Sequence, residues 1–143
     1  MPPQRPERDI AAHCIAARLR ILNRVVTGVY DDALRPHGLR VSQMNILAAI
    51  ASLGSVKQAE IARGLRLEKS TLSRDLDRML THGWVRATAG SGRAVLLEAT
   101  DAGRSLLAAV LPAWRGAQRE ATRLLKPTGV AAVAEAVEGL WAG

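Results

Sequence analysis

The segment "LRLEKSTLSRDLDRM", Leu65–Met79, decides the fold because it carries an apolar and a polar face at helical spacing. The apolar positions are Leu72, Leu76, Met79 and Leu80. Small hydroxyl groups and guanidinium groups fall on the opposite side, namely Ser70, Thr71, Arg74 and Arg78. We therefore predict a helix that packs one side on a core and presents the other to a partner.

The residues on either side of this helix complete a winged helix. The preceding "SVKQAEIARGL" predicts a short helix at about 58–63, closed by Gly64 in a turn that needs a positive φ. Two helices joined by such a turn are typical of a helix-turn-helix. The following "GWVRATAGSGRAVLLEAT" alternates apolar and polar residues around the turn "AGSG", which predicts a β-hairpin.

Two helices are predicted before this unit. Apolar residues recur at helical spacing from Asp9 to Leu34, which predicts one long amphipathic helix ended by Pro36 and Gly38. A second, almost wholly apolar helix follows, with Ser42 as its expected N-cap. Its lack of a polar face places it at the centre of the fold.

The chain after the hairpin returns to helical periodicity. We predict a long helix from Asp101, capped by Thr100 and kinked at Pro112, and a last short helix over 126–143. The first and last helices of so short a chain have few internal surfaces to cover. Burial against a second copy across a two-fold axis would cover their apolar sides.

Length and composition agree with one mainly helical domain. The 143 residues contain 48% apolar but only 3% aromatic residues, so the core must be built from Leu, Val, Ile and Ala. The formal net charge is +7, and residues 57–93 carry eight Lys and Arg against four acids, whereas residues 94–143 balance five against five. A basic middle beside a neutral end indicates one part that binds a polyanion and another that binds protein.

Several classes of function are disfavoured by what the chain lacks. The single cysteine, Cys14, excludes an internal disulfide and a multi-cysteine zinc site, and the three histidines have no metal-ligand spacing. There are no usefully spaced carboxylates, no nucleophile beside a His and no phosphate loop, so we predict neither an enzyme, a metal nor a cofactor. The start "MPPQRPERD" has no secretory apolar region, and the longest uncharged run, 41–56, is too short to span a bilayer. We expect a cytoplasmic protein that does not bind membranes.

Double-stranded DNA is the polyanion that suits the predicted surface. A major groove admits one helix, and small hydroxyls and Arg allow close approach and guanine recognition. A glycine turn carrying Arg93 suits a narrow minor groove. The alternatives are an ordinary solvated helix face with Arg–Asp ion pairs and a plain hairpin. The residues predicted to contact DNA are Lys69, Ser70, Thr71, Ser73, Arg74, Arg78, Arg86 and Arg93.

Three stretches, taken together, resemble the MarR family of bacterial winged-helix transcription regulators in order and spacing. They are "YDDALRPHGLRVSQMNIL", "AEIARGLRLEKSTLSRDLDRMLTHGWV" and "LLEATDAGRSLL", within a resemblance covering about residues 14–125. The resemblance implies a homodimer held by its N- and C-terminal helices, a recognition helix at about Glu68–Thr81 and a wing at Arg86–Val95. It also implies a repressor of nearby genes, bound to a pseudo-palindromic operator and released by a small effector, often a phenolic or other aromatic acid. One departure is Ser91, where the family usually has an Asp that pairs with the wing Arg.

These observations lead to one fold and several functional hypotheses. We expect a single domain, residues 1–143, with a winged-helix part at about 41–98 and dimerisation helices at about 9–35 and 101–142. An acidic effector needs a cation, which points to His13, Arg18 and Arg24 as candidate effector ligands. Cys14 has the position of the oxidant-sensing cysteine of some family members, although a buried, inert cysteine is the alternative. A winged-helix protein-interaction module that does not bind DNA is the other alternative.

Overall fold

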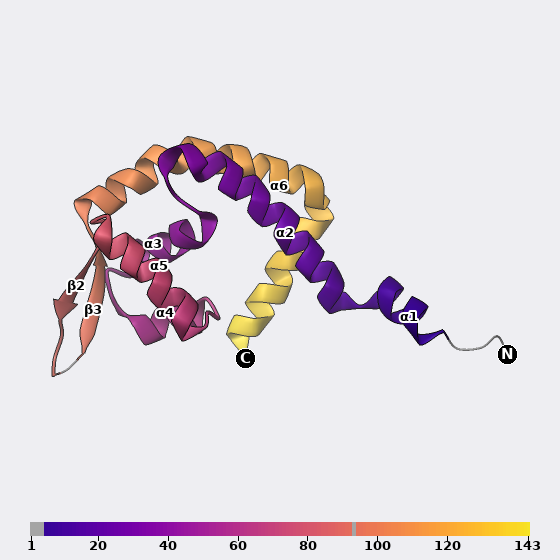
Figure 1. The fold of residues 1–143 in the computed structure, drawn as a ribbon, viewed down its shortest axis with the longest axis horizontal. Helices are drawn as coiled ribbons and strands as arrows, with labels where there is room; N and C mark the ends of the chain where they lie inside the picture. Colours follow the sequence, from indigo (N-terminus) through magenta and orange to yellow (C-terminus); the bar gives the residue numbers. More distant parts are fainter. Residues whose placement is uncertain (1–4, 93) are drawn as a thin grey trace.

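A computed structural model describes residues 5–92 and 94–143 and shows a winged helix attached to long helices (Figure 1). Its elements are α1 (Pro6–His13), α2 (Ile15–Leu34), the 3-10 helix η1 (Arg35–His37), α3 (Val41–Leu53), β1 (Ser55–Lys57), α4 (Gln58–Gly64), α5 (Lys69–Thr81), β2 (Val85–Ala89), β3 (Val95–Ala99) and α6 (Asp101–Ala142). The predicted mainly α fold with a small β wing is confirmed.

The core of the winged helix forms where α3, α5 and the sheet meet. The apolar side of α5 is buried as predicted, with Leu72 and Met79 wholly inaccessible to solvent. They belong to one cluster with Ile46 and Leu47 of α3 and Leu97 of β3. Leu80 was expected to join them, but it is 38% exposed because it lies beside, not on, the row through Leu72, Leu76 and Met79.

A third strand extends the predicted hairpin into a sheet with the order β1-β3-β2. Both pairings are antiparallel, with Val56 of β1 opposite Leu97 of β3. The sequence did not predict β1, because three residues are too few to show an alternating pattern and the strand exists only through its pairing with β3.

The turn of the helix-turn-helix is closed by Arg66, not by the predicted Gly64. Gly64 is the last residue of α4, whereas Arg66 takes the left-handed conformation with φ 54°. The Leu67 amide donates to the Ala62 carbonyl at 2.9 Å and the Arg66 amide to the Arg63 carbonyl at 3.3 Å. These two bonds define a Schellman motif, whose left-handed residue follows the helix by two positions.

The predicted continuous helix from Asp9 to Leu34 is wrong, because the chain breaks at Cys14. Cys14 is extended, with φ −63° and ψ 111°, and separates α1 from α2. The guanidinium of Arg18 donates to the carbonyl of Ala12, which the break has left without its helical partner. No residue of α1 is buried, so no packing keeps it in line with α2.

The break in α6 lies at Lys126, beyond Pro112, where we predicted a kink. Lys126 has φ 63° and ψ 160°, and the residue before a proline, here Pro127, is disfavoured in helical geometry. Pro112 lies inside the helix, which has no non-helical residue there, and α6 as a whole arches over the winged helix in Figure 1. The prediction of a separate last helix after residue 126 is therefore confirmed.

The last helical segment turns back toward the helix-turn-helix (Figure 1). The indole of Trp141 donates to the Gly64 carbonyl at 3.2 Å, and the guanidinium of Arg66 donates to the Leu140 carbonyl at 3.4 Å. Each helix end thus supplies a donor for a terminal carbonyl of the other.

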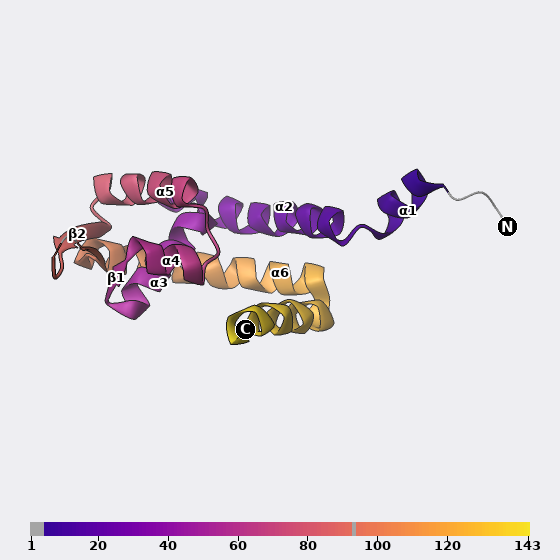
Figure 2. The ribbon, with the colours of Figure 1, turned by 90° about the horizontal axis from the view of Figure 1, so that it is seen from below.

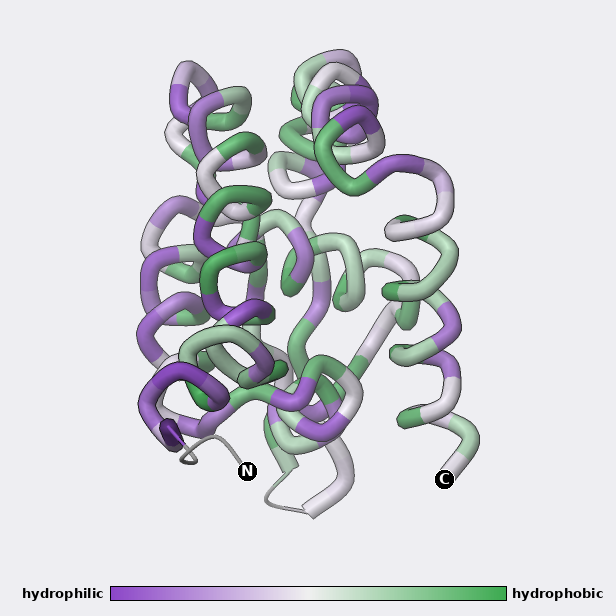
Figure 3. The backbone as a smooth tube through the Cα atoms, turned by 90° about the vertical axis from the view of Figure 1, so that its right-hand side faces the viewer, coloured by the Kyte–Doolittle hydropathy of each residue, from purple (hydrophilic) through white to green (hydrophobic). Residues whose placement is uncertain are grey.

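Helices α2 and α6 lie side by side above the winged helix (Figures 1 and 2). The Tyr30 hydroxyl of α2 donates to the side-chain carbonyl of Gln118 on α6. Away from this contact, α1, the start of α2 and the end of α6 expose many apolar side chains, and apolar positions recur along these segments in Figure 3. They include Ile15, Leu19, Ile21, Val25, Val133, Val137, Leu140 and Trp141.

The end of α2 also fixes the start of α3. The carboxylate of Asp31 accepts a hydrogen bond from the Val41 amide at 2.8 Å, and the side chain of Gln43 accepts one from the Arg40 amide at 3.1 Å. The helix begins at Val41, so the expected N-cap Ser42 lies inside the first turn and is exposed. Asp31 from α2 and Gln43 within α3 therefore take the place of the predicted Ser42 cap.

We predict that Gly103→Ala lowers the free energy of unfolding by roughly 1–3 kcal/mol. Gly103 is buried where α6 starts, and a Cβ there would lie 2.2 Å from the Trp84 carbonyl oxygen. Gly116→Ala is the control on the same helix, because its Cβ would meet nothing closer than the end of Arg119 at 3.7 Å. Urea unfolding should show a loss for the first variant and a small gain for the second; equal stability of the two would contradict the close approach.

We predict that Asp31→Ala lowers the free energy of unfolding by about 1 kcal/mol, because the Val41 amide loses its acceptor. The neighbouring Asp32→Ala should change it little, since Asp32 only pairs with Arg35 at 2.7 Å in a solvent-exposed position. Thermal or urea unfolding of the two variants checks this difference, and an equal loss in both would refute the cap.

Candidate nucleic-acid interface

The outward side of α5 forms an uncovered polar surface, here called the recognition face: Ser70, Thr71, Arg74 and Arg78. All four side chains are exposed, and within residues 5–92 and 94–143 none of them takes part in an intramolecular hydrogen bond or ion pair. Asp75 and Asp77 lie on the same helix but form no ion pair with these arginines in that part of the chain. The observed geometry therefore disfavours the alternative in which Arg–Asp pairs cover this surface.

The recognition face begins directly after the turn that precedes α5. Lys69 is the first residue of α5 and is exposed, beside backbone amides that a helix start leaves without partners. A phosphate can bind to a lysine and such amides together. The predicted role of Lys69 thus agrees with its place at the helix start.

Ser73 differs from the other predicted contacts because its hydroxyl already has a partner. It is half-buried and accepts a hydrogen bond from the side-chain amide of Gln58, the first residue of α4, at 2.9 Å. This bond ties α4 to α5. Ser73 therefore lies at the edge of the recognition face and contributes to the angle between the two helices.

The wing carries the two remaining predicted contacts. Arg86 lies in β2 near the base of the hairpin, where its guanidinium binds the Glu98 carboxylate at 3.0 Å through Nε and 2.9 Å through Nη2. Gly92 turns the chain with φ 68°, and the Gly90 amide bonds to the Ala94 carbonyl at 2.8 Å. Arg93 lies outside the described residues.

The structure does not gather the three candidate effector ligands into a pocket. His13 ends α1 and binds the Asp9 carboxylate at 2.8 Å, and Arg18 is bonded to the Ala12 carbonyl. Arg24 is exposed on α2. None of the three lines the arginine-rich cleft described below or the other main clefts of the described residues.

Cys14 lies at the break between α1 and α2 and is half-buried. The only tyrosine of the chain, Tyr30, is bonded to Gln118, and burial raises the pKa of its hydroxyl. Oxidant sensing through Cys14 stays a prediction, since the thiol has no hydrogen-bond partner among residues 5–92 and 94–143 that would support it.

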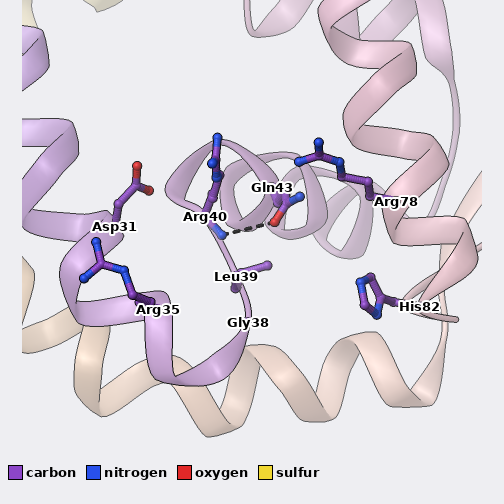
Figure 4. Close-up of a pocket in the computed structure, with 8 residues that line it drawn as sticks. All are labelled: Asp31, Arg35, Gly38, Leu39, Arg40, Gln43, Arg78 and His82. Carbon is purple, nitrogen blue, oxygen red and sulfur yellow. Dashed lines mark hydrogen bonds between the residues drawn. The ribbon is translucent and has the colours of Figure 1, made fainter.

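A cleft of about 490 Å³ lies between the end of α2, the start of α3 and the end of α5, and sequence reasoning did not predict it. This arginine cleft is lined by Asp31, Arg35, Gly38, Leu39, Arg40, Gln43, Arg78 and His82. In Figure 4 the Arg40 and Arg78 side chains reach the same side with Gln43 between them, while Arg35 lies across the cleft. The cleft is thus basic, and it shares Arg78 with the recognition face.

Two further properties bear on the class of site. Across residues 5–92 and 94–143, no three His, Cys, Asp or Glu side chains lie close enough to hold a metal ion. In the same ranges, the helices lack a stretch with the length and apolar character needed to cross a bilayer.

Comparisons with known proteins give the same fold and a family. A model of the MarR family matches residues 37–94. PecS, an HTH-type transcriptional regulator of Dickeya dadantii, is 26% identical over 109 residues, which cover 73% of this chain and 66% of PecS. The chain thus spans just under two thirds of that relative.

Solved structures match over most of the chain. The transcriptional regulator MosR of M. tuberculosis, in complex with DNA, is 34% identical with a TM-score of 0.77, covering 91% of this chain and 98% of MosR. A mutant MarR of E. coli, complexed with operator DNA, is 18% identical with a TM-score of 0.80, covering 92% and 96%, and shows the shared fold. This chain therefore belongs to the MarR family of winged-helix transcription regulators, a family of DNA-binding proteins rather than enzymes.

Proposed function

We propose that this protein is a homodimeric repressor that binds a pseudo-palindromic DNA operator and is released by a small acidic effector. The observation that carries the proposal is the recognition face, whose hydroxyls and arginines stay exposed while the opposite side of α5 is sealed in the core. Arginine can bind a guanine edge with two hydrogen bonds in the major groove, and small hydroxyls permit the close approach. MosR and MarR, which share the fold, were each solved with DNA.

Different parts of the fold would bind DNA and a second copy of the chain. The winged-helix part, at about 41–98, carries the recognition face and the wing, and the helices at about 9–35 and 101–142 carry the exposed apolar side chains. A second copy would cover Leu19, Val133 and Val137 and place two recognition faces on successive turns of a duplex. Because the proposed partner is DNA, the cytoplasm is the expected site of action.

For the effector, the arginine cleft is better supported than the site predicted from His13, Arg18 and Arg24. Arg40 and Arg78 bring two positive charges to one side of the cleft, and neither has an ion-pair partner among the residues described. A carboxylate can be held between two guanidinium groups. Since Arg78 also belongs to the recognition face, an acid bound there would compete with DNA for that side chain.

The proposal as a whole is tested by selecting bound sequences from random duplexes with the full chain and measuring its mass in solution by sedimentation. We expect a two-fold symmetric site with half-sites about one helical turn apart and twice the chain mass. A monomer, or a selection that enriches no sequence, would refute the proposal.

We predict that Arg74→Ala and Lys69→Ala weaken DNA binding in different ways. Arg74→Ala should reduce discrimination between selected and random duplexes by about 1–3 kcal/mol, because a base contact is lost. Lys69→Ala should weaken both duplexes alike and reduce the slope of log K against log salt by about 0.9 per chain. Fluorescence anisotropy titrations at several salt concentrations check both, with Arg115→Ala, an exposed cation on α6, as the control.

We predict that Arg40→Gln weakens binding of salicylate by roughly tenfold, because one charged donor is removed from the arginine cleft. Arg35→Gln is the matched control, since that guanidinium already binds Asp32 at 2.7 Å. Calorimetric titration with salicylate, and with the neutral salicylamide as the control ligand, measures the effect. Equal affinity for acid and amide, or equal loss in both variants, would disprove this site.

A further inference from the structure

Three polar side chains stand in one row across the outer side of the sheet, one from each strand. In the register of the sheet, Glu98 of β3 lies opposite Ser55 of β1 on one side and opposite Arg86 of β2 on the other. The neighbouring row, through Val56 and Leu97, points into the core. The polar row, here called the wing ladder, therefore lies at the base of the wing, on the side away from the core.

Glu98 is the centre of the wing ladder and uses both of its oxygens. The Ser55 hydroxyl donates to Oε1 at 2.5 Å, while Arg86 donates to Oε2 through Nε at 3.0 Å and Nη2 at 2.9 Å. Hydrogen bonds from Ser55 and from Arg86 hold the pKa of Glu98 below its ordinary value. The carboxylate is therefore charged at neutral pH, and the row joins all three strands by charge-assisted bonds.

Among the described residues of the wing tip, few contacts fix the direction of the wing. Gly90 and Gly92 flank Ser91, which stands where the Asp of the MarR family's usual wing pair would be. Between tip and ladder, Thr88 makes a hydrogen bond of 3.5 Å to the Leu96 carbonyl, at the limit of useful geometry. The firm side-chain link between β2 and β3 among the residues described is thus the Arg86–Glu98 pair.

The wing ladder also determines what Arg86 can do. An unpaired arginine on a wing binds phosphates of any sequence, which strengthens nonspecific binding. The Arg86–Glu98 pair has no net charge with which to attract a phosphate, although the Arg86 side chain is 60% exposed. An isolated exposed ion pair contributes little to stability, so the consequence of this one lies in orientation and charge.

We infer that Glu98 is a positioning residue for DNA binding, which sets the direction of the wing from its base and withholds Arg86 from the phosphate backbone. The inference rests on the proposed DNA-binding function and adds to it. Removal of the carboxylate charge should therefore act in opposite directions on the two kinds of duplex. Binding to the selected operator should weaken, and binding to random duplex should strengthen.

The test compares Glu98→Gln with the parent chain on the selected operator and on a random duplex. We expect roughly fivefold weaker operator binding, tighter random binding, and a salt slope steeper by about 0.9 per chain. Hydroxyl-radical protection in the minor groove at the wing should fade, while dimethyl sulfate protection of guanine N7 under α5 should remain. A loss of fold alone would reduce both protections together.

Three other variants separate the parts of the inference. Arg86→Gln removes the ion pair with Glu98 without leaving an unpaired cation. Binding to the operator should therefore weaken, while binding to random duplex should not strengthen. Ser55→Ala removes only the bond to Oε1 and should give a smaller effect in the direction of Glu98→Gln. Glu120→Gln is the matched control, because Glu120 pairs with Arg123 on α6, away from the wing, and should change neither duplex.

The outcomes distinguish this inference from the function on which it rests. A parent chain that binds no selected duplex would overturn both. A parent that binds, together with a Glu98→Gln variant whose operator affinity, random affinity and minor-groove protection are unchanged, would overturn the inference alone. Should Glu98→Gln unfold at the assay temperature, the same comparison is made with Arg86→Gln, for which unchanged minor-groove protection is equally decisive.

Discussion

Burial of one side of α5 is the constraint on which the rest of the structure depends. Leu72, Leu76 and Met79 are sealed against α3 and the sheet, and each buried side chain of this size stabilises the fold by about 1.5–3 kcal/mol. Rotation of the helix by one residue would expose them and force a guanidinium into the core, where an unpaired charge is strongly unfavourable. The same packing that stabilises the domain therefore determines which side chains face outward.

Sequence analysis predicted the elements whose residue patterns lie within a few positions. It missed the elements that form only through contacts with residues distant in the sequence. The periodicity of α5, the hairpin after it and the Thr100 cap of α6 are visible within a few residues, and all three are present. The strand β1 becomes recognisable only beside β3. The two prolines of α6 differ: Pro112, where we predicted a kink, lies within the helix, whereas the residue before Pro127 leaves the helix, since a proline also restricts its predecessor.

The candidate site was predictable where it lies on a single helix and unpredictable where it is assembled from several. The recognition face follows from the helical spacing of Ser70, Arg74 and their neighbours. The arginine cleft joins residues from the end of α2, the start of α3 and the end of α5, spread over positions 31–82, and no spacing rule relates them. Likewise, the sequence predicted Arg86 as a DNA contact, and only the strand register shows that Glu98 lies opposite it and pairs with it.

The reversal at Lys126 has a consequence for communication within the protein. It brings Trp141 and Leu140, at the end of the helix proposed to associate with a second copy, against Gly64 and Arg66, which shape the turn that aims α5. The proposed dimer interface and the turn before α5 are thus neighbours. A displacement of either segment would therefore alter the two hydrogen bonds that join them.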